Sequence, residues 1–239
     1  MLRNKVVNLL LSLGILGQIA CQQSESSDAK AGSPALPDYI AQKAGPKDVI
    51  VQLFNWPFSR ISDEMERLAR MGYGQIHVSP PNLTIDSDQW WGRYQPVDYR
   101  IIAGPLGSET EFKRMIEKAH KLGINIIVDV VFNHTANEIS PLPREAKEIV
   151  DREGPLFSAS AYHSPFCISN YDDAWQVRNG RLCGGDGDRG LPDLDQGSEE
   201  VLRVQRDFLR KLVKLGVDGF RFDAIKHMEP DYFAKLFAG

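Results

Sequence analysis

The sequence predicts an α/β fold in which helices cover a parallel sheet. Four apolar, β-rich runs alternate with three amphipathic helical stretches along residues 48–224. Each helical stretch closes with Met-Gly or Leu-Gly, and an apolar run follows within a few residues. This alternation is typical of parallel sheets, because a crossover helix must carry the chain back before the next parallel strand can begin.

The individual elements follow from local patterns in the sequence. The strands are expected, in order, at residues 48–56, 74–81, 124–134 and 217–224. The helices are expected at residues 61–72, 108–123 and 198–216, where apolar residues recur at helical spacing. Ser108 and Glu111 form a predicted capping box at the start of the second helix, and Gly123 marks its end.

Two architectures satisfy this pattern, a doubly wound open sheet and a (β/α)8 barrel. The first strand is followed by FNWPFSR, which lacks the glycine-rich fingerprint of a dinucleotide-binding sheet. Polar residues instead gather at the C-terminal ends of the strands: Asn55, Ser79, Asn133, His134, Asp223 and His227. Barrel enzymes build their sites at these strand ends, so we predict the strands of a (β/α)8 TIM barrel.

An unusually long segment separates the third strand from the fourth. The interval between the helix-closing Gly123 and Gly216 is much longer than the interval between Gly72 and Gly123. The extra length is rich in Gly, Pro, Asn and Asp and carries one short helical period near Ala146. We therefore predict a small inserted subdomain over residues 135–196, at the mouth of the barrel.

The N-terminus predicts export. Arg3 and Lys5 precede an apolar stretch that ends at Cys21, which is the pattern of a signal peptide over residues 1–21. The segment resembles a bacterial lipoprotein signal, which implies a lipid anchor on Cys21. Plain cleavage and an uncleaved membrane anchor are the alternatives. Residues 22–46 have the composition of a flexible linker, so barrel structure is expected from residue 47. The predicted location is the cell surface, the outer membrane or the medium.

The charge and the cysteine content limit the possible binding partners and indicate the cellular compartment. The net charge is −4 and the body of the chain has no basic run, which excludes a nucleic-acid partner. Cys167 and Cys183 are the only cysteines after Cys21. Export favours their oxidation, and closing a loop of this length stabilises a fold by about 3 kcal/mol on the loop-entropy model. We therefore predict a Cys167–Cys183 disulfide.

Several motifs resemble one enzyme family. VDVVFNH at residues 128–134 and GFRFDAIKH at residues 219–227 resemble the first and second signatures of the α-amylase family, glycoside hydrolase family 13. VSPPN, WWGRYQPVDYRI and NYDDAWQVRNGRL resemble stretches of secreted α-amylases, in the same order. The resemblance spans residues 48–237 and implies the N-terminal half of the barrel, with residues 197–239 supplying its third helix, fourth strand and the start of its fourth helix.

The resemblance assigns the chemistry of the fourth strand. The family uses a retaining mechanism, in which one carboxylate attacks the anomeric carbon and a second carboxylic acid protonates the leaving oxygen. It implies that Asp223 is the nucleophile. Arg221 lies two residues earlier, on the same side of the strand, where a fixed cation would keep Asp223 ionised and oriented. A purely structural Arg–Asp pair is the alternative.

The resemblance also implies a sugar-binding surface. Tyr94 would be the platform for the reacting sugar, and Trp90 and Trp91 would be walls of the same groove, unless Trp90 belongs to the core. The other residues expected to contact the glucan are Gln95, His134, Lys226 and His227.

Calcium is the implied metal. By resemblance, its ligands are the side chains of Asn133 and Asp193 and the carbonyl oxygens of Arg178 and His227, an all-oxygen set that suits a hard cation. Neighbouring carboxylates that could substitute for Asp193 are Asp186, Asp188 and Asp195. Some members also bind chloride through an arginine at the place of Arg221, which this sequence leaves undecided.

The implied activity is hydrolysis of α-1,4-glucosidic bonds in starch or glycogen. The family's general-acid glutamate and its second aspartate would both follow residue 239, so we expect this chain alone to be inactive, with two open sheet edges that favour self-association. Transglycosylation or another α-glucosidase activity is one alternative. A catalytically incompetent glycan-binding remnant is the other.

Overall fold

The computed structural model describes residues 49–185 and 187–238. The predicted signal peptide, its Cys21 and the linker lie outside these residues. The strands are β1 (Ile50–Leu53), β2 (Gln75–Val78), β3 (Asn82–Thr84), β4 (Pro96–Ile102), β5 (Asn125–Val130) and β6 (Gly219–Phe222). The helices are α2 (Phe58–Arg70), α3 (Glu109–Lys121), α4 (Arg144–Glu153), α5 (Ala174–Asn179), α6 (Glu199–Leu215) and α7 (Tyr232–Phe237). In this part of the chain, no helix has the length and apolar character needed to cross a bilayer.

A four-stranded parallel sheet in the order β1-β2-β5-β6 forms the centre of the fold. Its strands are the four that the apolar runs predict, each shorter than the run that contains it. Ile76 pairs in register with Val51 on one side and with Ile126 on the other. The predicted parallel arrangement is therefore confirmed.

The two faces of this sheet differ in chemistry. Ile76, Val78, Ile126 and Val128 belong to the hydrophobic core and are almost fully buried. Side chains alternate between faces along a strand, so the residues between them point to the opposite face. That face carries His77 on β2, Asp129 on β5 and Arg221 on β6. The sheet thus has an apolar side that packs on helices and a polar side that holds the candidate site.

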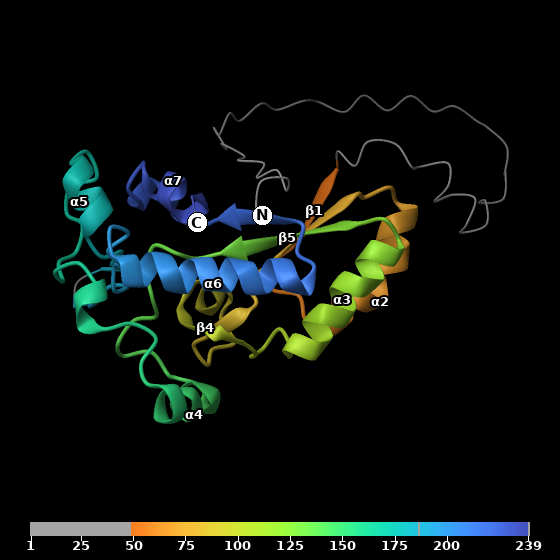
Figure 1. Cartoon of the computed structure of the whole chain (residues 1–239), viewed down its shortest axis with the longest axis horizontal. Helices are drawn as coiled ribbons and strands as arrows, with labels where there is room; N and C mark the ends of the chain where they lie inside the picture. The colour runs from red at the N-terminus through yellow and green to blue at the C-terminus, as the bar shows by residue number, and fades with distance from the viewer. Residues whose placement is uncertain (1–48, 186, 239) are drawn as a thin grey trace, which may run out of the picture.

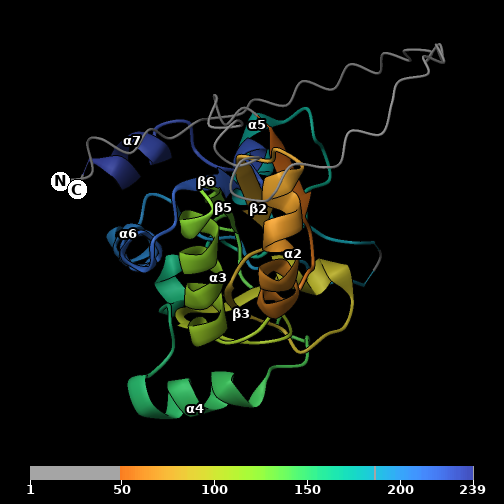
Figure 2. The same cartoon turned by 90° about the vertical axis from the view of Figure 1, so that its right-hand side faces the viewer.

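Helices α2 and α3 lie side by side against the apolar face, with α6 beside them (Figures 1 and 2). Ile61, Met65 and Leu68 on α2 are buried at the spacing that the sequence predicts. Phe58 at the start of α2 packs on Phe112 of α3, with ring centroids 5.0 Å apart. These aromatic and aliphatic contacts hold the helices to the sheet.

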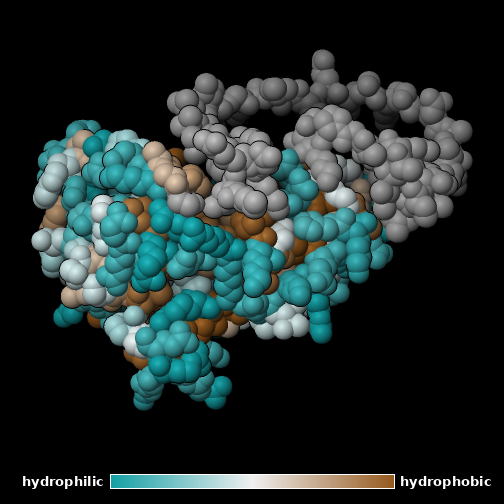
Figure 3. All heavy atoms as spheres, viewed as in Figure 1, coloured by the Kyte–Doolittle hydropathy of each residue, from teal (hydrophilic) through white to brown (hydrophobic). Residues whose placement is uncertain are grey.

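Helix α6 is amphipathic as predicted. Val201, Val204, Phe208 and Leu212 are buried, and Leu215 is half-buried. The opposite side exposes the charged residues Arg203, Asp207, Arg210 and Lys214, and it forms the hydrophilic band across the middle of Figure 3. Gly216 ends the helix in the left-handed conformation, with φ of 105°, where a glycine meets no side-chain strain.

The chain between β2 and α3 forms a small antiparallel sheet of β3 and β4. The sequence analysis did not predict this sheet. Its register shifts on both sides of Leu83, so no regular alternation marks it in the sequence. The Tyr99 hydroxyl on β4 donates a 2.5 Å hydrogen bond to the carbonyl of Val131, just beyond β5. The small sheet is thereby tied to the end of a central strand.

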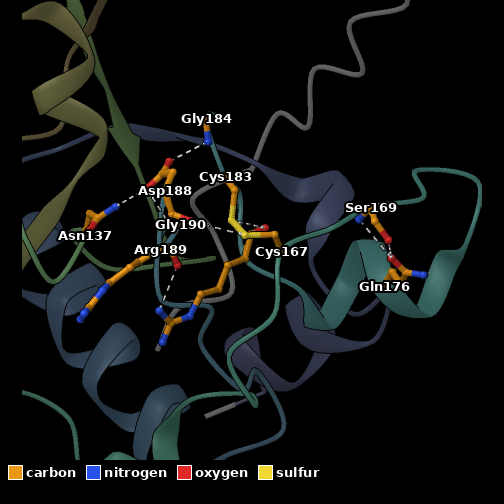
Figure 4. The surroundings of a disulfide bond; sticks show 10 residues. Asn137, Cys167, Ser169, Gln176, Cys183, Gly184, Asp188, Arg189 and Gly190 are labelled. Atoms are coloured by element: carbon orange, nitrogen blue, oxygen red, sulfur yellow. Dashed lines mark hydrogen bonds between the residues drawn. A yellow bond between two sulfur atoms is a disulfide. The ribbon is translucent and has the colours of Figure 1, made fainter. Parts of the chain in front are cut away.

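The segment between β5 and α6 holds α4, α5 and irregular turns, and the boundaries predicted for it as a subdomain stay a prediction. Cys167 and Cys183 form a disulfide here, which confirms the predicted pairing (Figure 4). Beside it, the Asp188 carboxylate accepts hydrogen bonds from the backbone N–H groups of Gly184 and Gly190. Covalent and polar ties therefore order a stretch that has little regular structure of its own.

The N-terminus of α3 provides a stability test. The Ser108 hydroxyl accepts a hydrogen bond from the backbone N–H of Glu111, and the Glu111 carboxylate accepts one from the backbone N–H of Ser108, which confirms the predicted capping box. Ser108→Ala should lower the free energy of unfolding by about 1 kcal/mol. Urea denaturation measures this change. Ser198→Ala is the matched control, because Ser198 occupies the same position of α6 without a side-chain cap hydrogen bond. Equal losses in the two variants would contradict the prediction.

Candidate active site

Three charged residues meet on the polar face of the sheet, at the ends of β5 and β6. Asp129 and Arg221 are direct neighbours in the strand register. Asp223 follows β6, and its backbone N–H donates to the carbonyl of Val130 at the end of β5. Parallel pairing therefore places both carboxylates beside one guanidinium.

Arg221 bridges the two carboxylates. Its Nη1 lies 2.9 Å from both oxygens of Asp129 and 2.7 Å from Oδ1 of Asp223. Asp129 is completely buried, whereas the Asp223 side chain keeps 21% of its surface exposed. One carboxylate thus holds the arginine from inside, and the arginine orients the other carboxylate at the accessible strand end. The predicted pairing of Arg221 with Asp223 is confirmed.

Burial and neighbouring charges shift the pKa values of this cluster in opposite directions. Burial raises the pKa of Asp129 to about 6, although the positive charge and hydrogen bond of Arg221 counteract part of that shift. For Arg221 itself, burial is the largest single effect and lowers the pKa, but the charge and hydrogen bond of Asp129 together with the charge of Asp223 outweigh it, so the net shift is upward. Arg221 is consequently a permanent cation beside Asp223.

Tyr94 joins this cluster from the turn at Trp90–Tyr94. Its hydroxyl donates a 3.0 Å hydrogen bond to Oδ2 of Asp129, and its ring stacks on Phe54 with centroids 5.8 Å apart. Burial raises the pKa of Tyr94, so its hydroxyl remains a donor. Trp90 and Trp91 are 59% and 43% exposed, so the alternative that Trp90 belongs to the core is wrong.

His134 and Gln95 connect the turn at Trp90–Tyr94 to the segment after β5. His134 is buried, and its Nε2 donates a 2.9 Å hydrogen bond to the Tyr94 carbonyl. The Gln95 side-chain oxygen accepts hydrogen bonds from the Asn137 N–H and the Ser140 hydroxyl. In this arrangement both side chains organise the rim of the site.

The chain turns sharply after Asp223. Ala224 has φ of 53°, one of two positive values among the described non-glycine residues, and the turn Ile225–His227 follows it. Lys226 Nζ lies 5.3 Å from the ring centre of Tyr171, and the Tyr171 ring meets His227 edge-on at 6.1 Å. The turn therefore brings both predicted contact residues next to an aromatic ring of the inserted segment.

A second buried polar cluster lies around Asn133 and Asp193. Asn133 Nδ2 donates to Asp193 Oδ1 at 3.0 Å, and His163 Nδ1 lies 2.7 Å from Asp193 Oδ2. Burial raises the pKa of Asp193 to about 6. Asn133 Oδ1 is buried without a hydrogen-bond partner. A bound cation would satisfy this oxygen. Within residues 49–185 and 187–238, no three His, Cys, Asp or Glu side chains converge to hold a metal.

The remaining predicted calcium residues are placed as follows. His227 is buried, and its Nδ1 donates to the Val177 carbonyl at 2.9 Å. The Arg178 guanidinium lies 3.7 Å from Glu229. Of the possible substitutes for Asp193, Asp195 lies 3.6 Å from His163, and Asp188 binds the backbone of its own loop. Asp186 lies outside the described residues.

The sequence analysis missed two residues of the polar face. Asp129 stands within the VDVVFNH motif, but nothing local marks it as the partner of a residue almost a hundred positions away. His77 on β2 has Nε2 buried without a hydrogen-bond partner, 3.8 Å from Asp129 Oδ2. The period-2 alternation along β2 and β5 is the signal that would have found both, because it places them on the face opposite the core residues.

A parallel sheet with charged residues gathered at the C-terminal ends of its strands is typical of barrel enzymes. Residues 58–235 match the family model described as "Alpha amylase, catalytic domain". The chain therefore belongs to the α-amylase family of glycoside hydrolases, and its sheet is part of a (β/α)8 barrel.

Curated relatives and a solved structure agree with this assignment. The chain is 36% identical over 222 residues to an alpha-amylase of Aeromonas hydrophila, covering 84% of this chain and 47% of that protein. It is 40% identical over 209 residues to an alpha-amylase of Tenebrio molitor, covering 83% and 42%. A mutant of alpha-amylase I from Eisenia fetida, solved in complex with maltohexaose, superposes with a TM-score of 0.70 at 34% identity, covering 79% and 40%. The chain thus spans less than half the length of these relatives.

His77 provides a pH-dependent test. Burial lowers its pKa to about 4, with the positive charge of Arg221 contributing. Unfolded His77 binds a proton below about pH 6.5, whereas folded His77 stays neutral to about pH 4, so its contribution to stability is lost as the pH falls through this window. Glutamine does not titrate. We compare the free energy of unfolding of His77→Gln with that of the unmodified protein at each pH. This difference should shift in favour of His77→Gln by on the order of 2 kcal/mol between pH 7 and pH 4.5. Urea denaturation at both pH values measures the change, and identical pH profiles would contradict the prediction.

Proposed function

We propose that the protein to which this chain belongs is a retaining hydrolase of α-1,4-glucosidic bonds in starch- or glycogen-type glucans. The observation that carries the proposal is the bridge from buried Asp129 through Arg221 to accessible Asp223. A nucleophile must be ionised, held in one orientation and open to substrate, and this arrangement supports all three requirements for Asp223. A structural Arg–Asp pair would not require the second, buried carboxylate.

In the proposed reaction, an Asp223 oxygen attacks the anomeric carbon of the bound sugar and forms a glycosyl ester as the bond to the leaving oxygen breaks. A carboxylic acid protonates that oxygen, and water then hydrolyses the ester with the same group acting as base. By resemblance to the family, this acid would be a glutamate of the complete barrel. The chain described here would contribute the nucleophile and part of the binding surface.

The surroundings of Asp223 support a glucan as substrate. Trp90 and Trp91 expose aromatic faces, on which the C–H faces of sugars pack, and Tyr94 is fixed by its bond to Asp129. Lys226 and His227 lie beyond the nucleophile and would contact the leaving-group side. The maltohexaose in the related alpha-amylase I is a linear chain of this substrate class.

We also propose a calcium ion held by Asn133 and Asp193, with carbonyl oxygens of Arg178 and His227 completing the ligand set. The unpaired Asn133 Oδ1 and the adjacent buried carboxylate supply oxygen ligands of the kind that calcium prefers. Because these residues come from the segments that follow β5 and β6 and from the inserted segment, a bound ion would join the insertion to the ends of the sheet strands. Its role would be structural.

We further propose that the protein is exported. The Cys167–Cys183 disulfide supports an oxidising compartment, because such bonds seldom persist in a reducing cytosol. The lipid anchor on Cys21 stays a prediction.

The nucleophile assignment has a direct test. In the protein at the full length of its relatives, Asp223→Asn should lower the rate of starch cleavage by more than about a thousandfold, because the amide keeps the shape but cannot attack as a carboxylate. Reducing-sugar release measures the rate, and binding of maltoheptaose should persist. Asp207→Asn on the exposed face of α6 is the matched control. If Asp223→Asn retained a tenth of normal turnover, Asp223 would not be the nucleophile.

The calcium assignment is tested by stability rather than by activity. Calcium at about a hundredfold excess over its Kd should stabilise the unmodified protein by about 2.7 kcal/mol. Asp193→Asn should lose most of this effect, because it removes the proposed charged ligand. Asp195→Asn should keep it. Thermal unfolding with and without calcium measures both variants, and an unchanged calcium response of Asp193→Asn would reject the proposed site.

A further inference from the structure

An aromatic pair on the inserted segment is not part of the proposed cleft. Trp175, in the first turn of α5, is 63% exposed, the second-highest exposure among the described large hydrophobic residues. Its ring stacks on Phe166 with centroids 5.4 Å apart and an interplanar angle of 2°. One face of Trp175 is thus supported by Phe166, which fixes the orientation of a broad, accessible ring.

The surroundings of this pair are held rigidly. Phe166 precedes Cys167 of the disulfide, and its carbonyl accepts a 2.8 Å hydrogen bond from the Arg181 N–H. Asp173 caps α5 by accepting from the Trp175 N–H at 2.9 Å. The Gln176 side chain accepts hydrogen bonds from Ser169 and Asn170, as Figure 4 shows for Ser169. A surface ordered in this way loses little conformational entropy when a ligand binds.

Polar groups suited to hydroxyls lie beside Phe166 of this pair. Phe166 lines a hollow of about 430 Å³ together with the charged residues Glu138, Arg181 and Arg189. Glu138 pairs with Arg181 at 3.1 Å and with Arg189 at 3.4 Å, so donors and acceptors are fixed around the hollow. Aromatic rings flanked by planar, charged hydrogen-bonding groups match a sugar, which has both a C–H face and a rim of hydroxyls.

The pair also lies close along the chain to the proposed cleft. Tyr171 contacts His227 and Lys226 at the strand end that holds the candidate nucleophile. Trp175 follows four residues later, and such a stretch spans at most about 14 Å. A glucan that contacts Tyr171 beside Lys226 and His227 therefore lies within this distance of Trp175.

We propose that Trp175 and Phe166, with the adjoining hollow, form an accessory α-glucan-binding site on the inserted segment. The inference rests on the proposed function, because it assigns the same class of polymer to a second position. Its ligand is a linear α-glucan long enough to occupy both positions. The site would hold polymer near Asp223 without taking part in bond cleavage.

Affinity electrophoresis of the full-length protein in native gels that contain soluble starch tests this site. Asp223→Asn is used as the background, so that the starch is not consumed. Adding Trp175→Ala should weaken retention about three- to tenfold, the loss expected for one aromatic stacking contact. Leu142→Ala is the matched control, because it truncates another exposed apolar side chain of the same segment, 61% exposed, and should leave retention unchanged.

A direct measurement covers the case in which Trp175→Ala misfolds. The indole N–H resonance of Trp175, assigned by its loss in Trp175→Phe, should shift when maltoheptaose is titrated into the Asp223→Asn protein. Retention unaffected by Trp175→Ala in a folded protein, or an unmoved indole resonance, would overturn the site. Equal retention in gels that contain hydroxyethyl cellulose would overturn its preference for α-glucans. Starch cleavage by the unmodified protein is assayed separately, so an accessory site that fails leaves the proposed hydrolase intact.

Discussion

The buried carboxylate of Asp129 is the constraint on which the site depends. With a pKa raised to about 6, its ionised form opposes folding by roughly 3 kcal/mol at neutral pH. Arg221 and Tyr94 satisfy its oxygens, and the strand register sets Arg221 directly beside it. Without this carboxylate, Arg221 would lose the contact that fixes its position beside Asp223. Asp129 on β5 therefore controls, through Arg221, the orientation of the candidate nucleophile that follows the neighbouring strand β6.

The parts of the fold that depend on local sequence were predictable. The strands, the helical stripes and the Ser108–Glu111 box each follow from residues close together in the chain. The β3–β4 pair was missed because its irregular register leaves no periodic signal. Asp129, His77 and Tyr171 were missed for another reason: their partners come from other strands or from the inserted segment. The motifs predicted which residues would carry the chemistry, whereas long-range pairing determines which residues hold them in place.

The inserted segment and the strand ends form one interdependent unit. His134 lies opposite Asp193 in a bridge, Gln95 binds the backbone of Asn137, and His227 donates to the carbonyl of Val177. Each tie joins a residue near a strand end to the insertion, so disorder in one would loosen the other. The Cys167–Cys183 bond lies within the insertion and restrains it from inside. A segment with little regular structure can contribute to a precise site because these ties replace the packing of a conventional core.

The burial of Asp129 also sets a trade-off between the stability of the fold and the order of the site. A neutral side chain at this position would fold more easily at neutral pH, since it would avoid placing a charge in the interior. The same replacement would free Arg221 from the two oxygens that hold it and would leave the Tyr94 hydroxyl without its acceptor. At this position the robustness of the fold and the readiness of the site therefore oppose each other, so a substitution that raises the melting temperature should loosen the alignment of Asp223.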